Sequence, residues 1–549
     1  MKKALSILLA AVLMLLSLPA LAGQPVALTG KLMILHTNDT HGYGVTDPAA
    51  PSVGYAQVKQ YKSDAQALGA AVLLMDAGDV SQGQPLVNLS KGAEAFAFMN
   101  AAGYDVMCPG NHEFDWGVDI FLQNAGTADF PILCANLLRQ SDHTLYLPPT
   151  HIFTAGGYTV GVLGLTTPET LTKANPALLK NVDFLMGDAL VACTQQYVDE
   201  LKAAGCDLIV VLGHLGVDEQ SAGNRSRDVI SATTGIDLFI DGHSHVTLNE
   251  RVPQQHSEGD KNVPTTLLVS AGCYGGYIGE VVFDGKQLSA ALYAAQPTQV
   301  SAAYGDEEVS ALVGGVNAQV EAALGQTFAE TMVALNGERA PGVRTQETNL
   351  GDFCADAMLW QANQSYSQPV VAAFTNGGSI RASIPAGPIT MKNMKTVFPF
   401  GNTIAVLSAT GAELLELLEA SSFCAPQPAG GFLQVAGITC TIDTSVPYAQ
   451  GEQYPSSTFY APAKPGSRVT IETVGGKPFD PAALYVVATN DYLAAGGDQA
   501  YVLRYANQQT GYNTFIPLED ALIAYTKTVL GGVIGDNYAT PAGRIALLP

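Results

Sequence analysis

Short hydrophobic runs alternate with segments of helical periodicity over the first half of the chain. The runs include LMIL at 32–35, AVLLM at 71–75, DLIVVL at 207–212 and IDLFI at 236–240. Because these runs are apolar almost throughout, they predict strands that are buried on both faces. Helix-like stretches separate them, so the pattern predicts a layered α/β fold from residue 31 to about residue 285.

A different period appears between residues 306 and 324. Hydrophobic residues recur there at helical spacing: Val309, Leu312, Val313, Val316, Val320 and Leu324. Gly325 follows as a stop signal. We interpret residues 295–328 as an interdomain connection that contains a helix. A second α/β-like region, richer in Gly and Pro, is predicted beyond it.

The first residues have the pattern of a secretory signal peptide. Lys2 and Lys3 precede an apolar run, and Ala20-Leu21-Ala22 forms a small-x-small cleavage site. We expect residues 1–22 to be removed and the protein to be exported, to the periplasm or to the extracellular medium. The alternative is a membrane anchor, but the run is shorter than the roughly 20 apolar residues that a span needs. No membrane span is expected after cleavage.

Composition narrows the classes of function. The 549 residues include 26 Lys and Arg against 49 Asp and Glu, a formal charge of −23. Nucleic-acid polymers and anionic membranes are bound by basic surfaces, so this balance argues against both as partners. The net charge does not exclude a small anionic substrate, because a few positive charges within one binding site can attract it whatever the charge of the whole protein. The 47% of hydrophobic residues is enough for large cores.

Polar residues of metal-ligand type follow the predicted strands. They are Asp39 and His41, then Asp79, then Asn111, His112 and Asp115, then His214, and finally His243 and His245. Ligand sites of open α/β sheets form at the carboxyl ends of strands, so we expect these side chains to meet. Carboxylate, imidazole and amide groups together suit Zn, Mn, Fe or Co better than Ca. Two such metals would need a bridging carboxylate.

The motifs D-x-H, GD, GNHE, GH and GHSH occur in this order, each after a predicted strand. In this they resemble the 5′-nucleotidase family of metallophosphoesterases, over nearly the whole mature chain. The resemblance implies an α/β protein in which residues 23–305 form a calcineurin-like phosphoesterase domain, a four-layer β-sandwich flanked by helices. Residues 306–328 would form a linker helix, and residues 329–549 an α/β nucleotide-binding domain.

By motif position, the resemblance also implies two divalent metal ions, with Zn, Mn or Co expected. One metal would be held by Asp39, His41 and His245. The other would be held by Asn111, His214 and His243, with Asp79 bridging the two. Many relatives carry Gln or Asn at the position of His245. His112 corresponds to the catalytic histidine of the family, and Asp115 to the carboxylate that orients it.

The C-terminal motifs FTNGGSIRASI, VFPFGN and ATNDYLAAGGDQAY resemble the nucleotide-binding domain of the same family. Each motif alone would be read as turns and core aromatics. Together they imply that Phe400 and Tyr492 sandwich the base and that Asp498 binds ribose hydroxyls. Substrate would also contact Arg344, Asn376 and Arg381.

The reaction implied is metal-dependent hydrolysis of nucleoside 5′-monophosphates to nucleoside and phosphate by a dimetal-activated water, with UDP-sugars or other nucleotide diphosphates as further substrates. The alternative is a 2′,3′-cyclic-nucleotide 2′-phosphodiesterase/3′-nucleotidase. Such relatives carry Asn-Tyr after GNHEF, where this chain has Asp115-Trp116. A catalytically inactive extracellular nucleotide-binding protein is the alternative from another class; it is disfavoured because all seven ligand positions hold competent ligands. We expect a monomer, with a dimer as the alternative.

Overall fold

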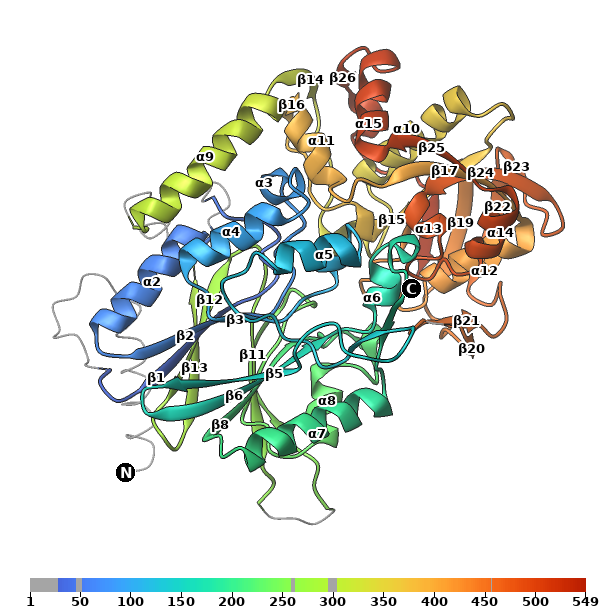
Figure 1. Ribbon diagram of the computed structural model, residues 1–549. Helices are drawn as coiled ribbons and strands as arrows, with labels where there is room; N and C mark the ends of the chain where they lie inside the picture. Colours follow the sequence, from blue (N-terminus) through green and yellow to red (C-terminus); the bar gives the residue numbers. More distant parts are fainter. Residues whose placement is uncertain (1–27, 46–51, 258–261, 295–303, 456) are drawn as a thin grey trace. The chain divides into compact units, whose positions relative to one another are not determined.

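The computed structural model describes residues 28–45, 52–257, 262–294, 304–455 and 457–549 (Figure 1). The predicted signal peptide lies outside the described residues. Contacts divide the chain into two compact units. Unit 1 comprises residues up to 82, 89–170 and 181–317, and unit 2 comprises 83–88, 171–180 and 318–549. Two short segments from the N-terminal half of the sequence therefore belong to unit 2.

Unit 1 is built on two sheets. The five-stranded sheet has the order β13-β12-β1-β2-β3. Its strands are β1 (Leu32–Thr37), β2 (Ala71–Asp76), β3 (Val106–Met107), β12 (Tyr277–Phe283) and β13 (Leu288–Ala294). The six-stranded sheet has the order β10-β11-β9-β8-β6-β5. Its strands are β5 (Thr150–Ala155), β6 (Tyr158–Thr166), β8 (Leu208–His214), β9 (Leu238–Ile240), β10 (Thr247–Pro253) and β11 (Thr265–Ala271). In the five-stranded sheet β1, β2 and β3 run parallel, and β12 and β13 continue the sheet beyond β1 in antiparallel pairs. In the six-stranded sheet β6, β8, β9 and β11 run parallel, and the two edge strands β5 and β10 are antiparallel to their neighbours.

The two sheets of unit 1 pack face to face. One core cluster joins Leu32 and Ile34 of β1 to Val160 of β6 and to Leu208 and Val210 of β8. All residues of β1 and β8 are buried. Burial on both faces explains why these strands have continuous rather than alternating hydrophobic runs.

Helices cover the outer face of each sheet in unit 1. On the six-stranded sheet these are α7 (Asp188–Ala203) and α8 (Ser226–Ala232) (Figure 1). On the five-stranded sheet they include α2 (Tyr55–Ala67) and α4 (Ala93–Ala102). Tyr61 of α2 donates a hydrogen bond to the Glu280 carboxylate of β12 (2.6 Å). The layers are thus helix, sheet, sheet and helix, which confirms the predicted four-layer arrangement.

Unit 2 is organised around a five-stranded sheet of order β18-β15-β24-β17-β25. Its strands are β15 (Ala372–Asn376), β17 (Thr403–Thr410), β18 (Leu433–Ala436), β24 (Leu484–Asn490) and β25 (Tyr512–Pro517). The helices α10 (Asn349–Ser365) and α15 (Leu518–Thr528) share one core cluster with this sheet. The other cluster includes α12 (Gly411–Ser421), α14 (Leu503–Thr510) and the strands β19 (Ile438–Asp443), β22 (Val469–Val474) and β27 (Ile545–Leu548). With β23 (Lys477–Pro478) these strands form a four-stranded sheet of order β23-β22-β19-β27. The α/β character predicted for this region is confirmed.

The remaining strands and helices of the described chain are shorter or lie between these elements. The strands are β4 (Leu137–Arg139), β7 (Val182–Phe184), β14 (Thr327–Thr331), β16 (Gly387–Thr390), β20 (Gln450–Gln453), β21 (Tyr460–Pro462) and β26 (Val533–Ile534). The helices are α3 (Pro85–Asn88), α5 (Val118–Ala125), α6 (Thr170–Lys173), α11 (Met391–Val397) and α13 (Asp491–Ala494).

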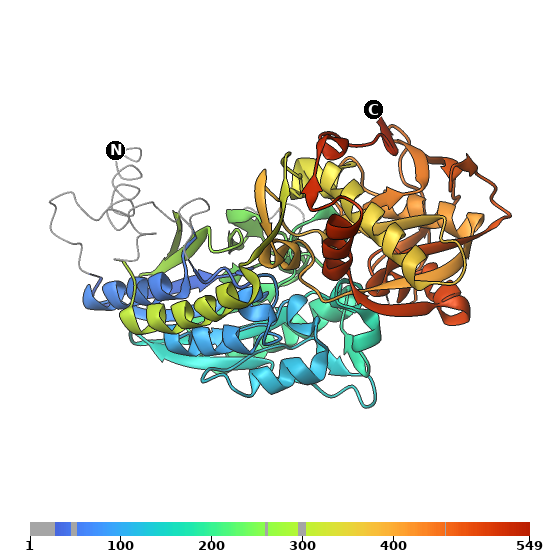
Figure 2. The ribbon, with the colours of Figure 1, turned by 90° about the horizontal axis from the view of Figure 1, so that it is seen from above.

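The helix predicted over residues 306–324 is confirmed as α9 (Glu307–Leu324). Asp306 precedes it, and its carboxylate accepts a hydrogen bond from the Val309 N–H (3.0 Å). The start of α9 is held against α2, because the Asp306 N–H donates to the Ala56 carbonyl (3.0 Å) (Figure 2). The chain passes from unit 1 to unit 2 within this helix.

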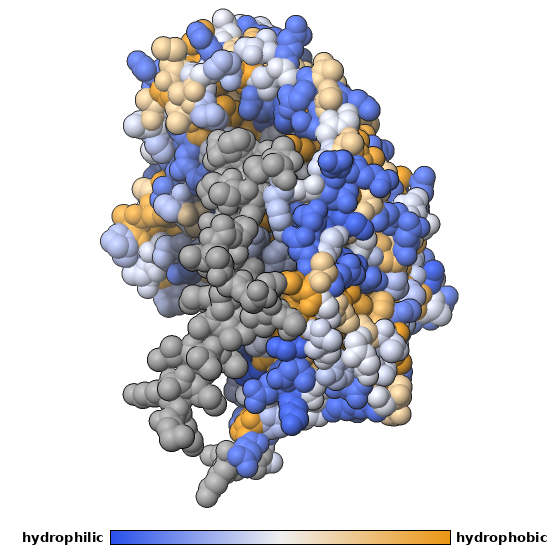
Figure 3. Space-filling model, turned by 90° about the vertical axis from the view of Figure 1, so that its left-hand side faces the viewer, coloured by the Kyte–Doolittle hydropathy of each residue, from blue (hydrophilic) through white to orange (hydrophobic). Residues whose placement is uncertain are grey.

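The hydropathy of the helices bears on whether any of them could span a membrane. None of the described helices combines enough length with enough apolar character to cross one. Figure 3 shows one face of the molecule, on which hydrophobic residues lie scattered among hydrophilic ones. Scattered exposed apolar residues of this kind are ordinary on a protein surface.

Candidate active site

The predicted metal ligands follow the carboxyl ends of strands in unit 1. Asp39 and His41 come after β1, Asp79 after β2, and Asn111 after β3. His214 is the last residue of β8, and the pair His243 and His245 follows β9. All five strands have a parallel neighbour in their sheet, so these ends point in a common direction within each sheet.

Five of the seven predicted ligands have a left-handed backbone. The φ angles are 50° for Asp39, 47° for His41, 62° for Asp79, 75° for His243 and 58° for His245. A non-glycine residue in this region costs of order 1–3 kcal/mol and persists only where surrounding contacts enforce it. Such a concentration of unfavourable backbone conformations is typical of functional sites.

The first predicted set is tightly gathered. His41 Nε2 lies 3.1 Å from His245 Nε2, and His245 Nε2 lies 3.3 Å from Asp39 Oδ1. The other ring nitrogen of His41, Nδ1, donates to the Gln82 carbonyl oxygen (2.9 Å). That contact directs His41 Nε2 towards Asp39 and His245, so the three side chains present two nitrogens and a carboxylate to one point.

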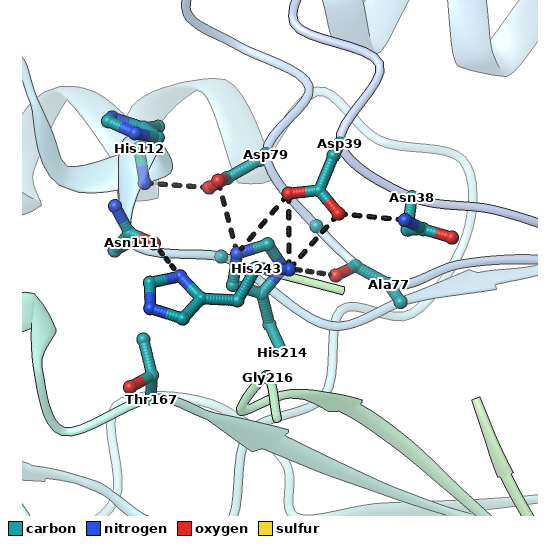
Figure 4. A network of polar contacts seen from close by, with 12 residues as sticks. Asn38, Asp39, Ala77, Asp79, Asn111, His112, Thr167, His214, Gly216 and His243 are labelled. Carbon is teal, nitrogen blue, oxygen red and sulfur yellow. Dashed lines mark hydrogen bonds and ion pairs between the residues drawn. The ribbon is translucent and has the colours of Figure 1, made fainter. Parts of the chain in front are cut away.

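The second predicted set surrounds Asp79. Its Oδ2 lies 3.1 Å from His214 Nε2 and 3.7 Å from His41 Nε2, so the carboxylate stands between the two sets. His243 Nδ1 lies 2.8 Å from Asn111 Oδ1. Figure 4 shows Asp39 and Asp79 both directed at His214, with the Asn111 amide pointing at the His243 ring. All seven predicted ligands thus form one connected polar network.

The negative charge of the carboxylates in this network favours a bound cation. Burial alone would lower the pKa of His214, but the carboxylates of Asp79 and Asp39 raise it to about 10. Burial acts to raise the pKa of Asp79, yet His214, His112 and His41 hold it well below its usual range. Carboxylates that favour a proton on His214 this strongly also favour a metal cation at the same place.

The residues present fit a divalent metal. Three groups of described residues could each hold an ion, with all ligand atoms of a group within 4.8 Å of one another: Asp39, His41 and His245; His41, Asp79 and His112; Asp39, Asp79 and His214. Within the described part of the chain, the buried His214 Nε2 has no hydrogen-bond partner of good geometry. The ligand groups are imidazole, carboxylate and amide, without thiolate, and this combination suits first-row divalent metals.

His112 begins a short 3₁₀ turn (His112–Phe114) directly beside the network. Its Nδ1 lies 2.7 Å from Asp115 Oδ2, and its backbone N–H donates to Asp79 Oδ1 (2.8 Å). The His112 and His41 rings meet edge to face, with centroids 5.2 Å apart. Asp115 is therefore placed to orient the imidazole, as the family resemblance predicts.

Glu113 lies within the same GNHE motif, and its role becomes clear only from the structure. Its carboxylate is buried. It accepts five hydrogen bonds, from the backbone N–H groups of Asp79, Val80, Ser81 and Gly110 and from the hydroxyl of Ser81. This one side chain therefore shapes the loop that carries Asp79. The GNHE motif draws attention to Glu113, but the sequence does not show which N–H and O–H groups donate hydrogen bonds to it.

The predicted substrate residues lie in unit 2. Asp498 is buried, with Oδ1 2.8 Å from Lys173 Nζ and Oδ2 accepting from the Asn376 amide (2.8 Å). The Tyr492 hydroxyl donates to the Thr172 carbonyl and accepts from the Asp498 N–H. Three predicted residues therefore share one network, in which Lys173 and Thr172 were not anticipated. Both residues lie more than 300 positions from Asp498 in the sequence, so no local pattern predicts these contacts.

Two predicted substrate residues meet elsewhere in unit 2. The Arg381 guanidinium lies 5.8 Å from the centre of the Phe400 ring, and both side chains are half-buried. Arg344 is also half-buried, and its carbonyl accepts from the Ala429 N–H (3.1 Å). Gly497 lies so close to the Tyr492 ring that an added Cβ would overlap the ring atoms. A glycine is required at this close approach.

Comparison with known proteins gives matches over most of the chain. The calcineurin-like phosphoesterase family matches residues 32–247, and the 5′-nucleotidase C-terminal domain matches residues 324–504. The trifunctional nucleotide phosphoesterase protein YfkN of Bacillus subtilis is 32% identical over 510 residues, which cover 85% of this chain and 32% of YfkN. The chain therefore spans about a third of the length of that relative.

Two further proteins are similar to this chain over most of the length of both sequences. The snake venom 5′-nucleotidase of Naja atra is 30% identical over 521 residues, which cover 86% of this chain and 92% of the venom protein. The crystal structure of the 5′-nucleotidase precursor from Thermus thermophilus has 31% identity and a TM-score of 0.79, covering 94% of this chain and 99% of that one. The fold, the converging ligand set and these similarities lead to one conclusion: the chain belongs to the 5′-nucleotidase family of metallophosphoesterases and is a hydrolase.

Proposed function

We propose that this protein hydrolyses nucleoside 5′-monophosphates to nucleoside and inorganic phosphate, in a reaction that depends on two divalent metal ions. One observation carries the proposal: seven ligand-type side chains from five separate motifs converge on one buried network, with the His112–Asp115 pair beside it. The similarity to 5′-nucleotidases supports the same substrate class.

In this proposal Asp39, His41 and His245 would hold one metal and Asn111, His214 and His243 the other, and Asp79 would serve both. Zn, Mn or Co suits the donor set. Bound divalent cations supply Lewis-acid activation of water and neutralise charge on the phosphoryl group. The network supports this assignment because Asp79 already stands between His41 and His214.

His112 acts on the phosphoryl group itself. With Nδ1 donating to Asp115, the opposite ring nitrogen, Nε2, is the one that would face the substrate. A protonated Nε2 would donate a hydrogen bond to a non-bridging oxygen, whose negative charge grows in the transition state. The backbone hydrogen bond from His112 to Asp79 supports this role, because it keeps the catalytic residue in register with the predicted metals.

Unit 2 supplies nucleotide recognition. Phe400 and Tyr492 would stack on the base, Asp498 would bind the ribose hydroxyls, and Arg344, Asn376 and Arg381 would contact the substrate. Because Asp498 is paired with Lys173 and Asn376, ribose binding would exchange at least one of these contacts. We assign residues 23–305 to the phosphoesterase domain, 306–328 to the linker that contains α9, and 329–549 to the substrate-binding domain. The segments 83–88 and 171–180 of the first range pack within unit 2.

A substrate panel tests the proposal. AMP, 3′-AMP, 2′,3′-cyclic AMP and UDP-glucose would each be incubated with protein reconstituted with Zn, Mn or Co, and phosphate or product release measured. We expect AMP turnover that a chelator abolishes and added metal restores. Preference for 3′-AMP and the cyclic nucleotide would favour the alternative branch of the family. Nucleotide binding without any turnover would overturn the proposal in favour of a binding protein.

Export and oligomeric state complete the proposal. Cleavage after Ala22 would leave Gly23 as the first residue of a periplasmic or extracellular protein. N-terminal sequencing of the protein recovered from outside the cytoplasm tests this, and retention of Met1 would contradict it. Light scattering during gel filtration distinguishes the expected monomer, of about the chain mass, from a dimer.

A further inference from the structure

A buried glutamate outside the predicted site contacts one of the predicted metal ligands. Glu169 follows β6 in the segment TTPET (166–170), and it has no exposed surface. Its Oε2 lies 2.8 Å from His243 Nε2. The opposite ring nitrogen, His243 Nδ1, lies 2.8 Å from Asn111 Oδ1. The His243 ring is therefore held between a carboxylate and the amide of another predicted ligand.

The turn that carries Glu169 is itself tied to the site. The Glu169 N–H donates to Thr167 Oγ1 (3.2 Å), and the Thr167 N–H donates to the carbonyl oxygen of His214 (3.0 Å). Thr166, just before this turn, pairs with His214 across β6 and β8. Glu169 thus has a defined position relative to two predicted ligands of the same metal.

The acceptor behind His243 differs from those behind the other histidines. His41 Nδ1 and His214 Nδ1 donate to backbone carbonyls, those of Gln82 and Ala77. His243 Nε2 meets a carboxylate, which accepts but cannot donate when ionised. With Nε2 donating to this carboxylate, the Nδ1 lone pair is left available to a cation, beside the acceptor oxygen Oδ1 of Asn111.

We propose that Glu169 is a positioning residue for the metal site formed by Asn111, His214 and His243. It fixes the tautomer and the orientation of His243, so that Nδ1 and Asn111 Oδ1 are presented together to one cation. This inference rests on the proposed dimetal function. Residues with this role typically change metal affinity by roughly 10- to 100-fold when they are replaced.

The test uses paired variants of the full chain and Co²⁺ as the probe. Glu169→Ala removes the acceptor, and Glu169→Gln keeps an acceptor oxygen without the charge. Glu280→Ala and Glu280→Gln are the matched controls, because Glu280 is a buried carboxylate of the same unit that accepts from the Tyr61 hydroxyl and touches no histidine among its described hydrogen bonds. Metal-free protein would be titrated with Co²⁺ and followed by calorimetry and visible absorption.

We expect Glu169→Ala to weaken one of the two Co²⁺ sites by roughly 10- to 100-fold and to alter its absorption spectrum, with a smaller loss for Glu169→Gln. Excess metal should restore AMP turnover, which a misfolded variant would not allow. Both Glu280 variants should bind Co²⁺ like the wild type. If Glu169→Ala does not fold, Glu169→Gln against Glu280→Gln carries the comparison. Equal Co²⁺ affinity in the Glu169 and Glu280 variants would overturn the proposal.

The outcome is separable from that of the proposed function. Co²⁺ binding is measured without substrate, so it does not depend on which phosphate ester the enzyme prefers. Wild-type protein that binds two Co²⁺ ions but hydrolyses no nucleotide would overturn the proposed reaction and leave the role of Glu169 supported or rejected by its own titration. Wild-type protein that binds no Co²⁺ would overturn both.

Discussion

Replacing Glu113 by glutamine probes how the loop that bears Asp79 is held. The Glu113 Oε2 atom accepts from the N–H groups of Asp79 (2.8 Å) and Gly110 (2.6 Å). The Oε1 atom accepts from the Val80 N–H (2.8 Å) and from the N–H (3.1 Å) and hydroxyl (3.0 Å) of Ser81. The glutamate is only 1% exposed, so water cannot replace these contacts. Its neutral substitute has a single acceptor oxygen.

The cost follows from this geometry. If the amide oxygen keeps the donors of Val80 and Ser81, the amide NH₂ faces the N–H groups of Asp79 and Gly110. Two buried donors are then unmatched, at about 1–3 kcal/mol each, so unfolding should become easier by about 2–6 kcal/mol. Ser81→Ala is the matched control, because it removes one donor and leaves four on the carboxylate. Its expected cost is about 1 kcal/mol.

The chain offers a convenient probe for this measurement. It has two tryptophans, Trp116 in unit 1 and Trp360 in unit 2. In a Trp360→Phe background, the fluorescence of Trp116 reports urea unfolding of unit 1 in metal-free buffer. A Glu113→Gln variant that unfolds at the same urea concentration as Ser81→Ala would refute the reasoning, since the five contacts would then contribute no more than one.

Three further outcomes are expected. His112→Ala should keep its full metal content, measured by elemental analysis, and lower kcat for AMP by about 10²–10³ because the donor to the phosphoryl oxygen is lost; unchanged turnover would remove His112 from the mechanism. The His214 pKa of about 10 means that a metal must displace a proton there, so affinity should rise with pH, by up to about tenfold per unit below pH 10. Calorimetry in buffers of different ionisation enthalpy measures the released proton, and none at about pH 7.5 would contradict this. Asn376→Ala removes the 2.8 Å hydrogen bond to Asp498 and should raise KM for AMP about tenfold in steady-state assays, with little change in kcat; an unchanged KM would argue against it.

The positions of Asp39, Asp79 and His214 could be predicted because each follows a continuous apolar run. Such a run is a strand buried on both faces, and the carboxyl ends of parallel strands meet. The helix α9 could be predicted because its hydrophobic period is local. In both cases the determining pattern lies within a short stretch of sequence.

Other features depend on contacts between distant segments. Glu169 acts through His243, 74 residues away, and Lys173 meets Asp498, 325 residues away. A threonine-rich turn such as TTPET has no distinctive composition, so nothing local indicates that its glutamate faces an imidazole. The carboxylate of Glu113 was visible within a motif, but its five donors come from two loops that only the folded sheet brings together.

The left-handed backbone at five predicted ligands has a consequence for how such a protein can change. Glycine would relieve the unfavourable φ at each of these positions, yet glycine offers no ligand atom. Stability and activity therefore oppose each other at the same residues. Repeated selection for heat resistance alone would be expected to discard Asp39, His41, Asp79, His243 and His245 early. If the five residues hold the proposed metals, activity outweighs backbone strain at each of these positions.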